Sequence, residues 1–92
     1  MPEAEFQRFY EKVKSKPFKD DRFDLIKIGV ANSGFTCKQC ARMMSIFSFD
    51  DEKMKVLSIF APHIVDRINY EDILKELNSL FKKDDAKKML RI

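Results

Sequence analysis

Apolar residues recur at intervals of three and four positions along almost the whole chain. The first stripe consists of Phe6, Phe9, Tyr10 and Val13. This spacing predicts an amphipathic α-helix, which should end before Pro17 because a residue that precedes proline is disfavoured in the α conformation. Further stripes lie in residues 23–30, 40–47, 54–60, 70–81 and 89–90. The pattern therefore predicts six short helices.

Polar residues placed before these stripes predict where the helices begin. Thr36 and Gln39 have the spacing of a capping box, in which each side chain binds the backbone N–H of the other residue. We expect the other caps at Asp20 or Asp21, at Asp50 or Asp51, at Asn69 and at Asp84. The second helix should end at Asn32-Ser33-Gly34, with Asn32 or Gly34 in the left-handed conformation.

A segment with two adjacent acids followed by apolar residues recurs at nearly constant spacing. Phe18–Ile26 lies 31 residues before Phe49–Leu57, and Lys82–Leu90 follows 33 residues after that. A period in this range is typical of stacked helical hairpins, in which no unit buries its apolar face alone. The approximate repeats are 4–31, 35–65 and 68–92, within one domain spanning 1–92.

These patterns predict an all-α fold of three consecutive αα-hairpins, arranged as a compact bundle or a short right-handed stack. The composition agrees with a globular domain, since 45% of residues are hydrophobic and 36% are charged. No apolar run approaches the length of a membrane span, and no secretory signal precedes the first helix. We therefore expect a cytoplasmic or nuclear protein, with the cysteines reduced.

Two segments carry a resemblance to a known family. One is Phe35–Gln39 followed by Phe47–Lys53, and the other is Ile64–Asn69. These segments resemble the domain-of-unknown-function family numbered 4476, and the resemblance covers nearly the whole chain. The family implies no activity, cofactor or catalytic residue. Its pattern has an apolar residue at the position of Cys40, which weakens the case for a dithiol site.

The candidate chemistry of the chain is sparse. Cys37 and Cys40 form a CxxC pair at a predicted helix start, where a thiolate is stabilised. However, no strand–helix–strand pattern surrounds it, and Cys40 lies on an apolar stripe. His63 is the only histidine, so a four-ligand zinc site lacks obvious donors. The acid pairs lack the spacing of a calcium loop. We expect no enzyme activity, no cofactor and no bound metal.

The leading hypothesis for function is a non-catalytic protein-interaction module. Several isoleucines lie off the main stripes, and a groove between hairpins that binds a peptide or a helix could use them. The candidate residues are Ile28, Ile46, Ile59, Ile64 and Ile68. The alternative interpretation is that these side chains complete a second face of the core.

A second hypothesis is weak binding of nucleic acid or another anionic surface. The formal net charge is only +3, and acids alternate with bases along the chain. The basic excess near the C-terminus could still form a basic face, consisting of Lys82, Lys83, Lys87, Lys88 and Arg91. A steep fall of affinity with salt would distinguish this function from an apolar groove.

Overall fold

The apolar stripes form α-helices, and the computed structural model describes all residues from 1 to 92. The predicted all-α fold is confirmed, with no β-strand. The α-helices are α1 Glu3–Lys14, α2 Lys19–Val30, α3 Cys37–Met44, α4 Asp50–Phe60, α5 Glu71–Leu74 and α6 Leu80–Met89. Two 3₁₀ turns, η1 Ala61–His63 and η2 Arg67–Asn69, connect α4 to α5.

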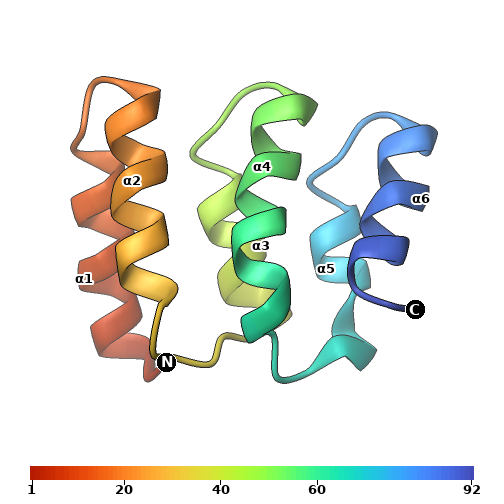
Figure 1. Ribbon diagram of the computed structural model, residues 1–92, viewed down its shortest axis with the longest axis horizontal. Helices are drawn as coiled ribbons and strands as arrows, with labels where there is room; N and C mark the ends of the chain where they lie inside the picture. Colours follow the sequence, from red (N-terminus) through yellow and green to blue (C-terminus); the bar gives the residue numbers. More distant parts are fainter.

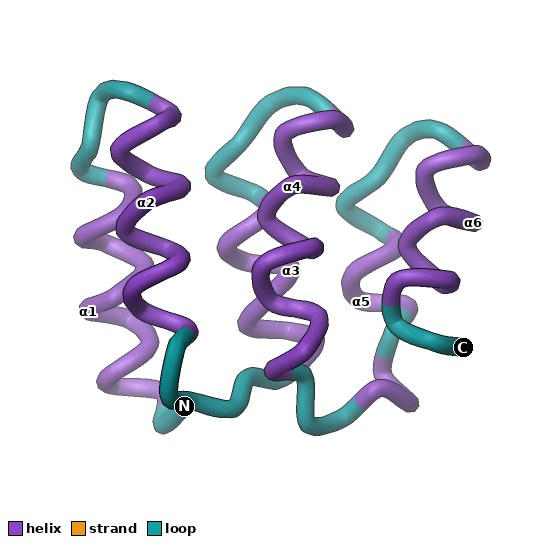
Figure 2. The backbone as a smooth tube through the Cα atoms, in the orientation of Figure 1, coloured by secondary structure: helices purple, strands orange, loops and turns teal.

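The helices form three antiparallel pairs that stand side by side, α1 with α2, α3 with α4, and α5 with α6 (Figure 1). The odd-numbered helices make one layer and the even-numbered helices make the other, since α3 contacts α1 and α5 while α4 contacts α2 and α6. The turns within the pairs lie at one end of the molecule, and the connections between pairs lie at the opposite end (Figure 2). That the pairs are copies of one repeated sequence unit stays a prediction.

The predicted helix caps are confirmed at one site and wrong at most others. Thr36 Oγ1 accepts from Gln39 N at 3.1 Å, and Gln39 Oε1 accepts from Thr36 N at 3.2 Å, so the capping box is present. The predicted aspartate caps of the second and fourth helices are wrong, because Phe18 and Phe49 occupy these N-cap positions. The acids that follow lie in the first turn, where they still interact favourably with the helix dipole.

The third hairpin differs most from the sequence prediction. The stripe from Tyr70 to Phe81 predicted one helix capped by Asn69, but α5 ends at Leu74 and Asn69 lies in η2. The last helix begins at Leu80, and its cap is Ser79, whose side chain accepts from Lys82 N; the predicted cap at Asp84 is wrong. Leu80 and Phe81 therefore lie at a helix start and not on a buried stripe.

The aromatic side chain of Phe35 joins the first hairpin to the second in the core. Its ring centroid lies 4.8 Å from that of Phe60 and 6.3 Å from that of Phe6. It belongs to a cluster of 21 buried residues that extends through all three pairs of helices. Such packing explains why no hairpin is expected to be stable alone.

The connections between hairpins also bind each other. Phe35 N donates to His63 O at 2.8 Å and Val65 N donates to Phe35 O at 2.9 Å, which forms a short parallel bridge between Phe35 and Ile64. The predicted left-handed residue at Asn32 or Gly34 is wrong, because the only positive φ in the chain is at Arg91.

Candidate functional site

The five isoleucines of the predicted groove lie in different environments. Ile64 is buried in the core at 6% exposure, and Ile46 and Ile59 are half-buried against it. Ile28 and Ile68 are exposed at 73% and 85%. Of the shallow hollows in the surface, one is lined by Ile28 and none by the other four residues. The structure therefore does not bring these side chains together in one hollow.

The basic residues of the second hypothesis all lie on α6 or directly after it. Lys82 Nζ pairs with Asp51 at 3.0 Å, and this hydrogen bond and charge raise the pKa of Lys82 above its usual value. Asp84 and Asp85 are exposed on the same helix, between the lysines. This arrangement offsets much of the positive charge that a nucleic-acid surface needs.

The two cysteines are free and fully buried. Cys37 Sγ donates to Asp66 O at 3.2 Å, and its backbone N–H donates to the Asp66 carboxylate at 2.7 Å. Burial, with the nearby Asp66 charge and hydrogen bond, raises the pKa of Cys37 to about 12. Burial also raises the pKa of Cys40 well above its usual value. At neutral pH both groups are thiols, which are poor nucleophiles and poor metal ligands.

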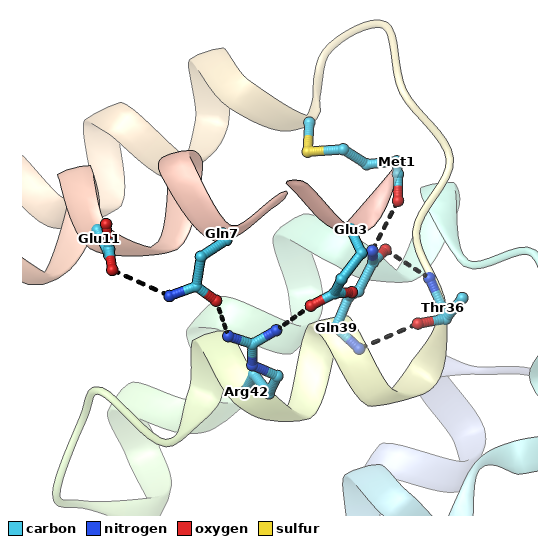
Figure 3. A network of polar contacts seen from close by, with 7 residues as sticks. All are labelled: Met1, Glu3, Gln7, Glu11, Thr36, Gln39 and Arg42. Atoms are coloured by element: carbon cyan, nitrogen blue, oxygen red, sulfur yellow. Dashed lines mark hydrogen bonds and ion pairs between the residues drawn. The ribbon is translucent and has the colours of Figure 1, made fainter. Parts of the chain in front are cut away.

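A polar network near the N-terminus joins α1 to α3 (Figure 3). Arg42 Nη1 lies 2.6 Å from Glu3 Oε1, and Arg42 Nη2 donates to Gln7. The same guanidinium lies about 5 Å from the ring centroids of Phe6 and Tyr10, within cation–π range. Every buried side-chain polar atom in the protein has a partner. The network is therefore a structural contact between two helices.

Several exposed apolar residues lie at the end of the molecule that carries the turns within the hairpins (Figure 1). Phe18 and Phe49 are each 70% exposed at the N-caps of α2 and α4, and Leu80 and Phe81 are 77% and 83% exposed at the start of α6. We call these four residues the turn face. Exposed apolar residues that gather in one region are typical of interaction sites.

Ion pairs between hairpins join the helix starts that carry the turn face. Lys19, beside Phe18, pairs with Glu52 of α4 at 3.6 Å. Asp51 of α4 pairs with Lys82 of α6. Because each pair joins the first turns of neighbouring helices, the exposed apolar side chains form a row across α2, α4 and α6.

Asp50 fixes the third member of this row. Its carboxylate accepts from Asn78 N at 3.1 Å and from Ser79 N at 2.9 Å, so it holds the turn that precedes α6. Asp50 therefore stabilises a different hairpin from its own, in place of the helix cap that the sequence predicted.

The turn face was not among the sequence-predicted sites. The apolar stripe in residues 70–81 assigned Leu80 and Phe81 to the buried side of a long fifth helix. One signal was present, since a phenylalanine directly precedes the acidic first turn at both Phe18 and Phe49. An N-cap residue precedes the first residue with helical backbone angles. Helical periodicity therefore gives no information on the burial of its side chain.

The hydrogen bonds to Asp50 predict acid sensitivity. The backbone N–H groups of Ser79 and Asn78 lower the pKa of Asp50 below its usual 3.8. A lowered pKa in the folded state contributes stability above the unfolded-state value, and this contribution is lost as the pH falls through and below 3.8. Melting temperatures of Asp50→Asn should therefore fall less steeply than those of the wild type from about pH 6 to about pH 2.

The control for this experiment is Asp84→Asn, which removes an exposed carboxylate that forms no ion pair in the structure. Its pH profile should follow that of the wild type. Parallel profiles for wild type and Asp50→Asn would contradict the assigned role of Asp50.

No group of three or more His, Cys, Asp or Glu side chains is placed to hold a metal ion. None of the helices has both the length and the apolar character needed to cross a membrane.

Comparison with family models matches residues 1–90 to a family described as a domain of unknown function, DUF4476. The chain therefore belongs to this family, as the resemblance of its sequence predicted. Searches among curated proteins and among solved structures give no match.

Proposed function

We propose that this member of the DUF4476 family is a non-catalytic protein-interaction module, and that the turn face binds an amphipathic helix of a partner protein. The observation that carries the proposal is the row of exposed Phe18, Phe49, Leu80 and Phe81 across three adjacent helices. The proposal retains the predicted class of function and moves the surface away from the isoleucine groove.

The geometry of the row favours a helical occupant. Packed helices lie about 8–10 Å apart, so the apolar anchors on α2, α4 and α6 should have a similar spacing. Residues seven positions apart on a helix are separated by about 10.5 Å along the axis and lie on nearly the same face. A partner helix with apolar residues at every seventh position would therefore contact each anchor in turn.

The charges at the turn face favour an apolar occupant over an anionic one. Lys19, Asp51, Glu52 and Lys82 neutralise one another in ion pairs between hairpins. These four charged residues beside the turn face therefore add no net charge to it. Binding through buried phenylalanine side chains should depend weakly on salt, whereas binding of nucleic acid falls steeply as salt increases.

The test is a selection from a displayed library of helical peptides at high salt, followed by affinity measurements with fluorescently labelled peptides. The double variant Phe49→Ser/Phe81→Ser should bind the enriched peptides at least tenfold more weakly, because truncation of a buried aromatic anchor typically costs more than about 1 kcal/mol. The peptides should gain helical circular dichroism when they bind.

The matched control is Ile28→Ser/Ile68→Ser, which removes two equally exposed apolar residues outside the turn face. This variant should bind as the wild type does. The proposal is wrong if no peptide is enriched, or if both double variants lose affinity equally. It is also wrong if the protein instead binds nucleic acid or lipid vesicles through the same phenylalanines.

A further inference from the structure

A hollow of about 400 Å³ lies at the opposite ends of α4 and α6, where both helices terminate. Its lining residues are Ser58, Ala61, Pro62, Arg67, Met89 and Arg91. A volume in this range is within that of small-molecule sites. The hollow is separate from the turn face, which lies at the helix starts.

Two guanidinium groups line the hollow, and no carboxylate does. Arg67 Nη2 donates to Ala61 O at 3.2 Å, which holds this guanidinium at the rim. Arg91 forms no ion pair, although four other cations of the chain do. Because an arginine has five N–H donors, most of the donors of this pair are free to bind an anion. Ser58 Oγ already donates to Lys55 O, so the guanidiniums supply the binding groups.

The backbone of Arg91 is held in an unusual conformation beside the hollow. Its φ is 60°, the only positive value in the chain. Ile92 N donates to Lys87 O and Arg91 N donates to Lys88 O, both at 3.0 Å, which is the pattern of a Schellman motif. Glycine is the usual residue at this position, so an arginine there is unfavourable for the helix end alone. The motif fixes the backbone of Arg91 and therefore the position from which its side chain extends.

The remaining wall of the hollow is apolar, formed by Ala61, Pro62 and Met89. The site therefore combines two positive charges with a surface for a hydrocarbon or ring. A phosphate monoester matches both parts, because its charge at neutral pH approaches −2 and its oxygens accept the paired N–H donors of guanidinium groups. A carboxylate brings only one charge to two arginines.

We propose that this hollow binds a phosphate monoester, with Arg67 and Arg91 holding the phosphate and Met89 contacting the organic group. This site is independent of the turn face and of the function proposed for it. The competing role for the arginines is to neutralise the carbonyl ends of α4 and α6, as Arg67 does at Ala61. That role requires no ligand, and it is the alternative outcome of the experiment.

The test follows ¹⁵N-labelled protein by NMR during titration with phenyl phosphate, at constant ionic strength set with sodium chloride. We expect saturable shifts at the Nε–H groups of Arg67 and Arg91 and at the Met89 amide, with a dissociation constant of the order of 1 mM. Inorganic phosphate should bind more weakly, because it lacks the apolar contact. Affinity should rise as the pH increases through about 6, where the monoester loses its second proton.

Arg67→Gln and Arg91→Gln should each weaken binding at least fivefold, while their amide spectra report an intact fold. The control is Arg8→Gln, an exposed arginine of α1 outside the hollow, which should bind as the wild type does. Separate titrations with phosphoserine and adenosine monophosphate distinguish a modified protein from a nucleotide as the source of the phosphate group. Shifts that do not saturate, or that Arg8→Gln reduces equally, would overturn the proposal in favour of simple helix-end neutralisation.

Discussion

Replacement of Phe35 by alanine is expected to destabilise the protein by about 3–5 kcal/mol, the usual cost of truncating a buried phenylalanine. Phe35 is fully buried and contacts Phe6, Phe9 and Phe60, so its ring links the first hairpin to the second. Since small domains are stable by only about 5–15 kcal/mol, the loss should be visible as a large fall in the denaturant midpoint. Equilibrium unfolding in urea measures it.

The matched control is Phe81→Ala, which removes the same side chain from a site that is 83% exposed. Its stability should lie within about 0.5 kcal/mol of the wild type. If Phe35→Ala is too unstable to purify, Phe35→Leu should show an intermediate loss, because leucine fills part of the same space. Equal losses for Phe35→Ala and Phe81→Ala would contradict the assignment of one ring to the core and the other to the turn face.

The Cys37 thiol is expected to react about a thousandfold more slowly in the native protein than in the unfolded chain. The thiolate is the reactive species, and burial together with Asp66 raises the pKa of Cys37 from 9.0 to about 12. Below both values each unit of pKa lowers the thiolate population about tenfold. Reaction with an aromatic disulfide reagent at mildly alkaline pH, with and without concentrated guanidinium chloride, measures the ratio.

A variant at the neighbouring carboxylate separates the two causes of this protection. Asp66→Asn removes the charge that raises the pKa of Cys37, while burial, which is the larger cause, is retained. Its native thiol should react several times faster than that of the wild type and far more slowly than the unfolded chain. A native rate within tenfold of the unfolded rate would contradict the buried thiol and restore the CxxC pair as a redox candidate.

The local sequence was informative wherever a structure depends on residues three or four positions apart. The Thr36–Gln39 capping box was predicted because both hydrogen bonds form within a single helical turn. The end of the first helix before Pro17 was predicted for the same reason, since proline acts on its immediate neighbour. The stripe of Phe6 and Val13 also identified core residues correctly.

The structure of the third hairpin could not be predicted from residues three or four positions apart. Asp50 accepts from the backbone of Asn78 and Ser79, and this contact spans 28 and 29 residues. It stabilises a turn inside a stripe whose spacing is otherwise that of one helix. Periodicity therefore favoured a helix that tertiary contacts interrupt, and it assigned Leu80 and Phe81 to the wrong surroundings.

The candidate sites depended still more on contacts distant in the sequence. The sequence predicted that Ile64 lines a groove for a partner. The side chain is instead buried in the core, next to the backbone bridge to Phe35. The position of Cys37 at a helix start predicted a stabilised thiolate, but burial and, to a smaller extent, Asp66 raise the pKa of this thiol. In both cases a contact with a residue 29 positions away in the chain contributes to the environment.

The sequence by itself determined that the chain is all-α, where the first helix ends and the third begins, and which family it belongs to, because these follow from short-range periodicity, capping and recurring motifs. Only the tertiary structure decided which apolar residues are exposed and which charges are paired. The row of Phe18, Phe49, Leu80 and Phe81 exists because ion pairs and Asp50 align the starts of three helices. The hollow between Arg67 and Arg91 likewise forms only where the ends of α4 and α6 come together.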